Sequence, residues 1–371
     1  MFETIGIILG SLLIILILVV LVRTLLFVPK KRKAIEGIPL NFPADEAITS
    51  LQEMIQCKTI SHKNEVDEDM GEFLKFEARL QKNFPQVHAH TELLKIGNKS
   101  LLYKWSGKQS TNTPTVLMSH YDVVPANEEL WEVDPFSGLI KDGYLWGRGT
   151  LDTKATLNGI MSAAETLIKQ GFVPENDIYF AFAGNEEVAG TGAPLIVQYF
   201  EKKHITPKLV VDEGGAIVEK IFPGVSRPCA LVGIAEKGML EIELVLKSNG
   251  GHASAPKPHT SVGELAQACV NVEAKPFPKN LSIPAKRMFD ILGRESSFIY
   301  RMIFANLWLF SGLLDALCKK NGGELNALMR TTMAFTQMEG SKANNVIHGG
   351  DSIYDVIHQD QLDHLQKIYD N

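Results

Sequence analysis

The chain has 371 residues, of which 45% are hydrophobic and 22% are charged, and this composition excludes a largely disordered protein. Its length is typical of roughly two domains. The formal net charge is −6 and no basic cluster lies inside the body of the chain, so we expect no nucleic-acid partner. The 4 cysteines show no CxxC spacing, which excludes a disulfide framework and a zinc-finger pattern.

Residues 1–30 form an apolar N-terminal segment. Between Ile5 and Val22 the single polar residue is Ser11, and about twenty apolar residues in a helix are enough to cross a bilayer. The residues before this run are acidic and no clear small-residue cleavage site follows it. This pattern favours a retained membrane anchor over a cleaved signal peptide, and both alternatives stay open.

Two features of the sequence disagree on the orientation of the body. The basic run at 30–33 favours a cytosolic body by the positive-inside rule. Two N-x-[ST] sequons, at Asn98 and Asn280, favour a lumenal or extracellular body. The sequence alone therefore leaves the orientation open.

The next part of the chain alternates helices with strands. Apolar spacing predicts helices at 44–58, 66–83 and 154–170, and buried strands at 115–119, 177–183 and 209–211. This alternation is typical of an α/β domain with a mostly parallel sheet. We predict one such domain over 44–227.

The pattern changes at about residue 228. A strand at 241–246, a helix at 261–271 and a strand at 327–338 predict a smaller α+β domain over 228–347, followed by a divergent tail at 348–371. The apolar stretch 298–318 is interrupted by Arg301, Asn306 and Asp315. Charged groups are costly at membrane depth, so we expect a buried or groove-lining helix pair there rather than a membrane span.

Candidate catalytic and metal-binding residues flank the predicted strands of the α/β domain. They are His120 and Asp122 after the first strand, Asp152 before the third helix, Glu186 and Glu187 after the second strand, and Asp212 and Glu213 after the third strand. In open α/β sheets, ligands bind beyond the carboxyl ends of the strands. We therefore expect these side chains to face one crevice.

Each of these groups alone fits an ordinary turn or helix start. Together they concentrate negative charge, and carboxylates packed this closely resist joint ionisation unless cations neutralise them. Two divalent metal ions would do so. One imidazole with several carboxylates and no nearby thiolate suits Zn²⁺, Co²⁺ or Mn²⁺, and availability favours zinc.

The spacing within two of the pairs also suits a metal site. His120 and Asp122 are two residues apart, so they share a face of an extended backbone and Asp122 can accept the second ring N–H of His120. Glu186 and Glu187 are adjacent and point in different directions. One can bind a metal while the other takes a proton from water.

Five motifs in order resemble the M20 family of metallopeptidases and amidohydrolases. They are SHYDVVP at 119–125, LWGRGTLDTK at 145–154, GNEEVAGTGA at 184–193, VVDEGG at 210–215 and GGHASAP at 250–256. The resemblance runs from about residue 45 to Ile347. The N-terminal segment and the apolar insert at 305–310 are similar to the N-fatty-acyl-amino acid synthase/hydrolase and carboxypeptidase S-like branch.

The resemblance implies roles for the metal ligands. His120 binds one zinc, Asp152 bridges two zinc ions and Glu187 binds the other. Asp212, or its neighbour Glu213, completes the shell of the first zinc. The implied fold is a zinc-peptidase-like α/β catalytic domain with an inserted α+β lid or dimerisation domain.

The resemblance also implies the chemistry. Glu186 is the general base, Asp122 orients His120, His252 contacts the substrate carbonyl and Asn345 helps to hold the substrate carboxylate. The implied reaction is two-metal hydrolysis of the amide bond of an N-fatty-acyl amino acid, or its reverse. Small peptides are the alternative substrate. A homodimer through the lid domain and a lumenal or extracellular body are implied too.

The resemblance weakens after Ile347, where the family's Asn-Val-Ile-Pro motif gives way to His-Gly-Gly-Asp. Family members continue further, through a last histidine ligand and the closing strands of the sheet. We therefore expect two zinc ions per full-length subunit and one incomplete site in this chain. An inactive member that binds or dimerises is the alternative function.

Overall fold

The computed structural model describes residues 2–30, 37, 42–109, 112–220, 222–235, 237–238, 240–339, 343–347 and 351–357. The chain divides into two compact units: the sheet unit, Ile35–Gly214, and the second unit, Met1–Ala34 with Gly215–Asn371. The predicted domain boundary lies near residue 228, and the domain limits remain a prediction. The basic residues 31–33 and most of the predicted tail, 358–371, lie outside the described residues.

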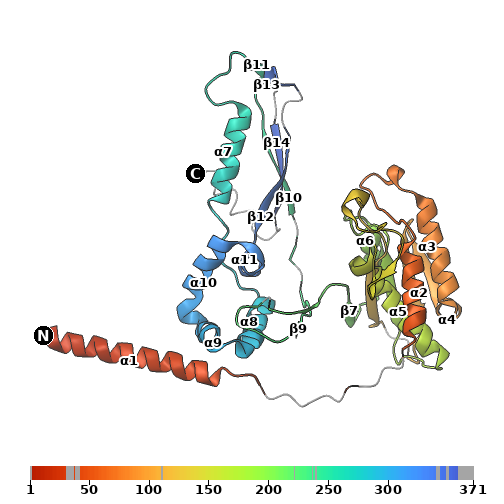
Figure 1. Ribbon diagram of the computed structural model, residues 1–371, viewed down its shortest axis with the longest axis horizontal. Coiled ribbons are helices and arrows are strands. Elements are labelled where there is room, and N and C mark those ends of the chain that lie inside the picture. The colour runs from red at the N-terminus through yellow and green to blue at the C-terminus, as the bar shows by residue number, and fades with distance from the viewer. Residues whose placement is uncertain are drawn as a thin grey trace. The chain divides into compact units, whose positions relative to one another are not determined.

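The sheet unit is built on a five-stranded mixed sheet (Figure 1). The strands are β1 (Glu92–Ile96), β2 (Ser100–Trp105), β3 (Thr115–His120), β6 (Ile178–Ala183) and β7 (Leu209–Val211), in the order β1-β2-β6-β3-β7. β3 pairs in parallel with β6 and β7, whereas β1–β2 and β2–β6 are antiparallel. The prediction of a mostly parallel sheet is therefore wrong. The apolar pattern missed the β1–β2 hairpin because Glu92, Lys95 and Lys104 interrupt its apolar residues.

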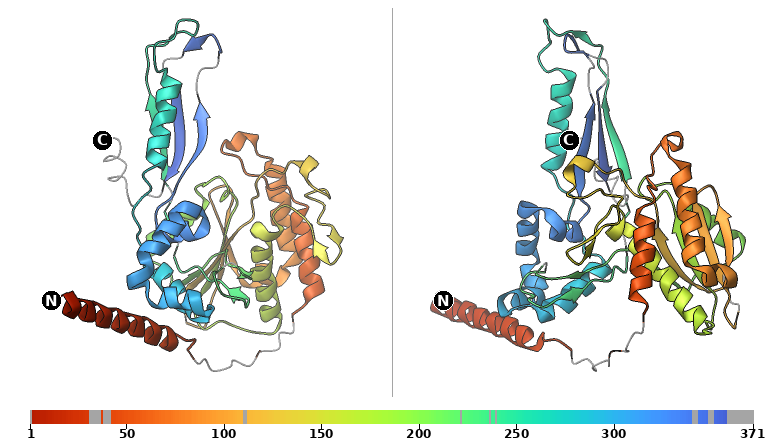
Figure 2. Two further views of the ribbon diagram at one scale, coloured as in Figure 1. Left: turned by 60° about the vertical axis from the view of Figure 1, so that its left-hand side comes forward. Right: turned by 45° about the vertical axis from the view of Figure 1, so that its right-hand side comes forward.

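Helices cover both faces of this sheet (Figure 2). They are α2 (Ala44–Ile55), α3 (Met70–Asn83), α4 (Pro85–His90), α5 (Ala155–Lys169) and α6 (Gly192–Lys202). Side chains alternate along β6, so Phe180 and Phe182 pack with α2–α5 on one face while Tyr179 and Ala181 pack with α6 on the other. The helices predicted at 44–58 and 66–83 are each shorter in the structure, since α2 ends at Ile55 and α3 begins at Met70. α3 begins at residue 70 because the Asp69 side chain accepts a hydrogen bond from Gly71 N.

The outer edge of β7 carries exposed apolar side chains. Leu209, Val210 and Val211 are 46–53% exposed, although they form a strand that pairs with β3 on one side. An apolar groove beside this strand is lined by Val116 and Ile196, among others. A small hairpin, β4 (Ile140–Lys141) with β5 (Tyr144–Leu145), completes the strands described in this unit.

The second unit combines helices with small antiparallel sheets. Its helices are α1 (Phe2–Leu26), α7 (Ser261–Glu273), α8 (Ile283–Glu295), α9 (Phe298–Ala305), α10 (Leu307–Asn321) and α11 (Gly323–Met329). Its largest sheet has the order β10 (Leu240–Leu246), β14 (Asp351–Ile357), β12 (Met333–Glu339). Two further pairs are β8 (Ile217–Val218) with β9 (Cys229–Ala230), and β11 (Gly251–His252) with β13 (Val346–Ile347).

Two predictions for this unit need correction. The predicted strand 327–338 begins too early, because residues 327–329 end α11 and β12 starts at Met333. The stretch 298–318 does form a helix pair, bent by 110° between α9 and α10. The pair is buried on one face only, since Phe304 and Cys318 lie in the core while Trp308 and Leu313 are exposed.

Candidate metal centre

His120 ends β3 at the carboxyl edge of the sheet and is 2% exposed. Its Nδ1 lies 3.0 Å from the backbone oxygen of Asp122, which fixes the ring and directs Nε2 toward three carboxylates. Nε2 is 2.9 Å from Asp152 Oδ1, 3.4 Å from Glu213 Oε1 and 3.7 Å from Glu186 Oε2.

Asp122 is fully buried behind His120. Its Oδ2 accepts hydrogen bonds from Ser61 Oγ at 2.7 Å and from Glu187 N at 3.1 Å, and its Oδ1 accepts one from Glu186 N at 3.1 Å. The carboxylate Oδ1 is 3.4 Å from His120 Nδ1, further than the backbone oxygen of the same residue. Asp122 thus connects the strand end that carries His120 to the turn that carries both glutamates.

Asp152 lies on a short turn, Thr150–Lys154, that leads into α5. Gly149 before it has φ +85°, and a Cβ there would come within 2.7 Å of Val123, so the motif needs glycine at this position. Lys154 is fully buried and its Nζ donates to the backbone oxygens of Met54 and Cys57, at 3.1 and 2.7 Å. These bonds tie the turn to the end of α2.

The turn after β6 presents Glu186 and Glu187. Asn185 is buried and its Oδ1 accepts a hydrogen bond from Gly192 N, while Gly190 N donates to its backbone oxygen. These hydrogen bonds fix the backbone of the turn that carries Glu186 and Glu187. Glu186 is exposed and Glu187 is partly exposed, so both carboxylates are accessible to solvent and substrate.

The carboxylate after β7 that joins the cluster is Glu213. One ligand atom each from His120, Asp152 and Glu213 lies within 4.8 Å of the others. Asp212 instead accepts a hydrogen bond from Glu213 N through Oδ1, at 2.8 Å. The structure therefore brings four of the predicted residues to His120 and Asp122, namely Asp152, Glu186, Glu187 and Glu213. The individual roles remain predictions.

The electrostatics of the cluster fit a divalent cation. Burial lowers the pKa of His120, but the Asp122 hydrogen bond and the charge of Glu213 outweigh it and raise the pKa to about 10. Burial and neighbouring carboxylates raise the pKa of Glu186, Glu187 and Glu213. The raised pKa values show that the cluster stabilises added positive charge, which a divalent cation would supply in place of the proton on His120. An imidazole nitrogen converging with carboxylate oxygens is a donor set that zinc accepts.

His252 and Asn345 lie in the second unit. His252 of β11 pairs with Val346 of β13, and Ala253 N donates a hydrogen bond to the Asn345 oxygen at 3.0 Å. The His252 Nδ1 lies 2.7 Å from Ser254 Oγ. The two predicted substrate-binding residues are therefore neighbours, and both are exposed.

Sequence reasoning missed two residues that support the centre. Ser61 donates to Asp122, and no motif around Ser61 signals this contact. Lys154 could have been recognised in the LDTK sequence, where a lysine precedes a helix rich in apolar residues. Burial lowers the pKa of Lys154 to about 7.

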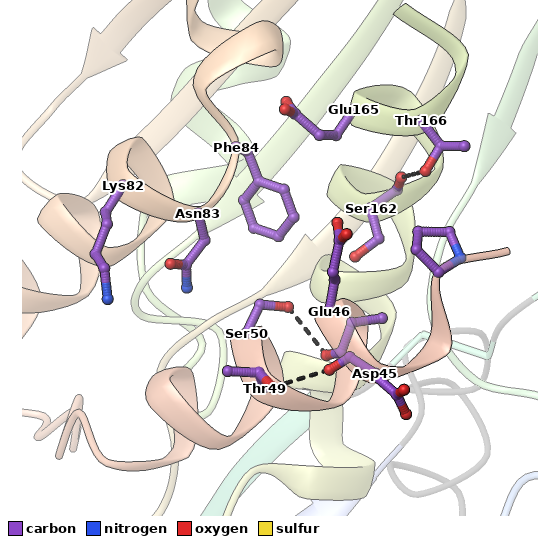
Figure 3. A pocket seen from close by; sticks show the side chains of 12 residues that line it. Asp45, Glu46, Thr49, Ser50, Lys82, Asn83, Phe84, Ser162, Glu165 and Thr166 are labelled. Atoms are coloured by element: carbon purple, nitrogen blue, oxygen red, sulfur yellow. Dashed lines mark hydrogen bonds between the residues drawn. The ribbon is translucent and has the colours of Figure 1, made fainter. Parts of the chain in front are cut away.

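A polar pocket of about 430 Å³ lies elsewhere in the sheet unit, between α2, α5 and the end of α3 (Figure 3). None of the predicted site residues lines it. Its buried Glu165 accepts hydrogen bonds from Gln86 N and Val87 N at 2.9 Å. This carboxylate therefore satisfies the free N–H groups at the start of α4.

The fold and the cluster fit a metallohydrolase, and comparisons with known proteins identify the class as one that acts on amide or peptide bonds. The chain belongs to peptidase family M20/M25/M40, whose model matches residues 116–309. It is 37% identical over 391 residues to a protein of Dictyostelium discoideum named "Probable carboxypeptidase S-like 2", covering 99% of this chain and 74% of that protein.

Two further comparisons agree with this placement. The chain is 36% identical to the N-fatty-acyl-amino acid synthase/hydrolase PM20D1 of Xenopus tropicalis, over 81% of this chain and 59% of that protein. The M20 family metallo-carboxypeptidase Sso-CP2 from Sulfolobus solfataricus shares the fold, with a TM-score of 0.55 and 18% identity over 88% of this chain and 76% of that one. The predicted family, branch and fold class are confirmed.

Proposed function

We propose that the chain provides the zinc centre of a hydrolase, and reverse synthase, of the amide bond in N-fatty-acyl amino acids. The observation that carries this proposal is the convergence of His120 Nε2 with Asp152, Glu213 and Glu186 at the carboxyl edge of the sheet. His120, Asp152, Glu187 and Glu213 are the residues that would hold the metal, with Asp212 as the alternative to Glu213. We propose two zinc ions per full-length subunit.

When bound, zinc would lower the pKa of water and polarise the amide carbonyl. Glu186 is the general base, because its carboxylate is accessible to solvent at the cluster and lies 3.7 Å from His120 Nε2, and because its pKa is raised above the ordinary value. Glu186 takes the proton of the attacking water and gives it to the departing amine. Asp122 keeps His120 oriented throughout, because it is buried and hydrogen-bonded on three sides.

The second unit would contribute substrate contacts. His252 donates to the oxygen of the scissile amide as negative charge develops there. Asn345 contributes its side-chain amide to the substrate carboxylate. Their adjacency across β11 and β13 supports a shared role in positioning.

The substrate class rests on relatives. The name of the Xenopus tropicalis relative supports N-fatty-acyl amino acids. The name of the Dictyostelium discoideum relative, which is the more similar, favours a carboxypeptidase acting on small peptides as the second candidate. The chain spans about three fifths of the first of these proteins and about three quarters of the second.

We also propose a homodimer formed through the second unit, and a membrane-anchored or secreted protein with its body on the lumenal or extracellular side. Among the described residues, α1 is the one helix that is long and apolar enough by itself to cross a membrane. A signal sequence has the same character.

The test is the Glu186→Gln variant. We expect hydrolysis of an N-oleoyl amino acid to be lost while bound zinc, measured by mass spectrometry, stays at the wild-type amount. Glu132→Gln is the matched control, because its side chain is exposed and lies outside the cluster. Normal turnover in Glu186→Gln would exclude this base, and turnover of dipeptides alone by the unaltered chain would favour the peptidase. If the unaltered chain hydrolyses neither substrate, the alternative of an inactive family member that binds or dimerises would be favoured.

A further inference from the structure

Hydrogen bonds centred on a buried asparagine join the last turns of α1 to the bend between α9 and α10. Asn306 is fully buried, and its Nδ2 lies 3.3 Å from Val20 O and 3.2 Å from Thr24 Oγ1 of α1. Arg23 donates back to Asn306 Oδ1 and to the Ala305 oxygen, at 3.2 and 3.0 Å. Buried polar groups of this kind hold two elements in one arrangement, because breaking the contact leaves them unsatisfied.

α10 then exposes a continuous apolar stripe. The exposed positions recur with helical spacing and are Trp308, Leu309, Gly312, Leu313, Ala316 and Leu317. The stripe ends at Lys319 and Lys320, and its large side chains, with Phe298 and Ile299 of α9, are 41–67% exposed. The opposite face of α10 is also apolar and packs on the core through Leu314 and Cys318. An apolar surface of this extent indicates a binding partner.

A basic pocket adjoins the stripe. It has a volume of about 380 Å³ and is lined by residues of α1, α8, α9 and α10, including Arg23, Lys286, Arg294 and Trp308. Asp290 pairs with Arg294 at 2.8 Å, which leaves Arg23 and Lys286 as the uncompensated charges of this lining. Basic side chains of this kind bind phosphate groups.

We propose that this surface, which we call the lipid face, docks on the membrane beside α1, with the α10 stripe in the bilayer interface and the basic pocket on the phosphate of an anionic lipid. The lipid face comprises the exposed stripe and the pocket residues. α1 is apolar all round and its end contacts α9, so the lipid face starts where α1 leaves the bilayer. Figures 1 and 2 show α10 running across the direction of α1, as a helix lying in the membrane plane would.

Charge and composition favour lipid over a second copy of the chain. A protein interface would have to bury the basic pocket against complementary acidic groups, whereas a bilayer supplies apolar chains and phosphates side by side. Trp308 at the border of stripe and pocket matches the interfacial preference of tryptophan. The lipid face goes beyond the proposed hydrolase activity and does not depend on it.

The first experiment measures quenching of Trp308 by brominated phosphatidylcholine in nanodiscs that carry the full chain. The sequence has 4 tryptophans, so Trp308→Phe identifies the Trp308 component by difference. We expect a component that brominated lipid quenches and that Trp308→Phe removes. Trp308 emission that brominated lipid leaves unchanged would overturn the proposal. If that emission were also shielded from aqueous acrylamide, a protein partner would be the occupant instead.

The second experiment tests the basic pocket. It compares quenching of Trp308 by brominated phosphatidylserine and brominated phosphatidylcholine, which gives the relative association constant of the anionic lipid. We expect Lys286→Glu to lower this constant by about fivefold or more, because each basic residue near the surface contributes on the order of 1 kcal/mol. Arg287→Glu is the matched control, since Arg287 is exposed on the same helix but does not line the pocket. Equal relative association constants for Lys286→Glu and Arg287→Glu would overturn the proposal of a phosphate site.

Discussion

The role of Asp122 can be tested by the Asp122→Asn variant. The change keeps the size of the side chain and removes its charge. The buried carboxylate accepts three hydrogen bonds, from Ser61 Oγ, Glu186 N and Glu187 N. Although burial raises its pKa, the nearby His120 ring and the hydrogen bond from Ser61 outweigh this and hold the pKa of Asp122 below its usual value. The surrounding groups therefore stabilise the ionised carboxylate of Asp122.

The size of the effect follows from these contacts. An asparagine amide has one acceptor oxygen, so its NH₂ group must face at least one of the three donors. A buried donor without a partner costs about 1–3 kcal/mol. Partners that support a metal-bound histidine contribute roughly 10- to 100-fold to metal affinity, or about 1.4–2.8 kcal/mol. We therefore expect zinc affinity to fall by one to two orders of magnitude.

The assay is zinc competition against a chromophoric chelator at constant pH. Asp142→Asn is the matched control, because Asp142 is exposed and has φ +55°, a backbone conformation that asparagine tolerates. Ser61→Ala removes one donor and keeps the charge, so its effect should be smaller. Zinc affinity in Asp122→Asn equal to that of Asp142→Asn would refute the reasoning.

Three further predictions follow. Glu213→Gln should reduce bound zinc more than Asp212→Asn, as measured by mass spectrometry after dialysis, because Glu213 lies 3.4 Å from His120 Nε2; the reverse order would assign the ligand to Asp212. Lys154 has a pKa of about 7 when folded and about 10.4 when unfolded, so the unfolded chain binds the extra proton between these values. The free energy of unfolding should rise from pH 7 to pH 10 in urea titrations in detergent, and Lys154→Met should flatten that rise. His252→Ala should lower kcat for the N-oleoyl substrate and leave bound zinc unchanged, and an unaltered kcat would remove His252 from the reaction.

The helices and the parallel strands could be predicted because their apolar patterns are strong. β3, β6 and β7 are short apolar runs, and the structure has β7 at the predicted residues. The β1–β2 hairpin could not be predicted in the same way. β1 is an edge strand with a largely exposed face, so its charged residues hide the apolar pattern.

The cluster around His120 could be predicted because most of its side chains follow strand ends. The choice between Asp212 and Glu213 could not, since adjacent carboxylates after a strand look equivalent in sequence. What separates them is local: Asp212 Oδ1 accepts a hydrogen bond from Glu213 N, while Glu213 Oε1 approaches His120. Ser61 is 61 residues from Asp122, and no local pattern records a contact over that distance.

The bonding of Asp122 has a consequence for how this centre can evolve. One residue positions three others: the backbone oxygen of Asp122 holds the His120 ring, and the Asp122 carboxylate accepts hydrogen bonds from the backbone N–H groups of Glu186 and Glu187. A substitution at any of these four positions therefore changes the fitness effect of substitutions at the others. The proposed substrate-binding residues His252 and Asn345 lie outside this interdependence, so substitutions there would leave the contacts of Asp122 unchanged.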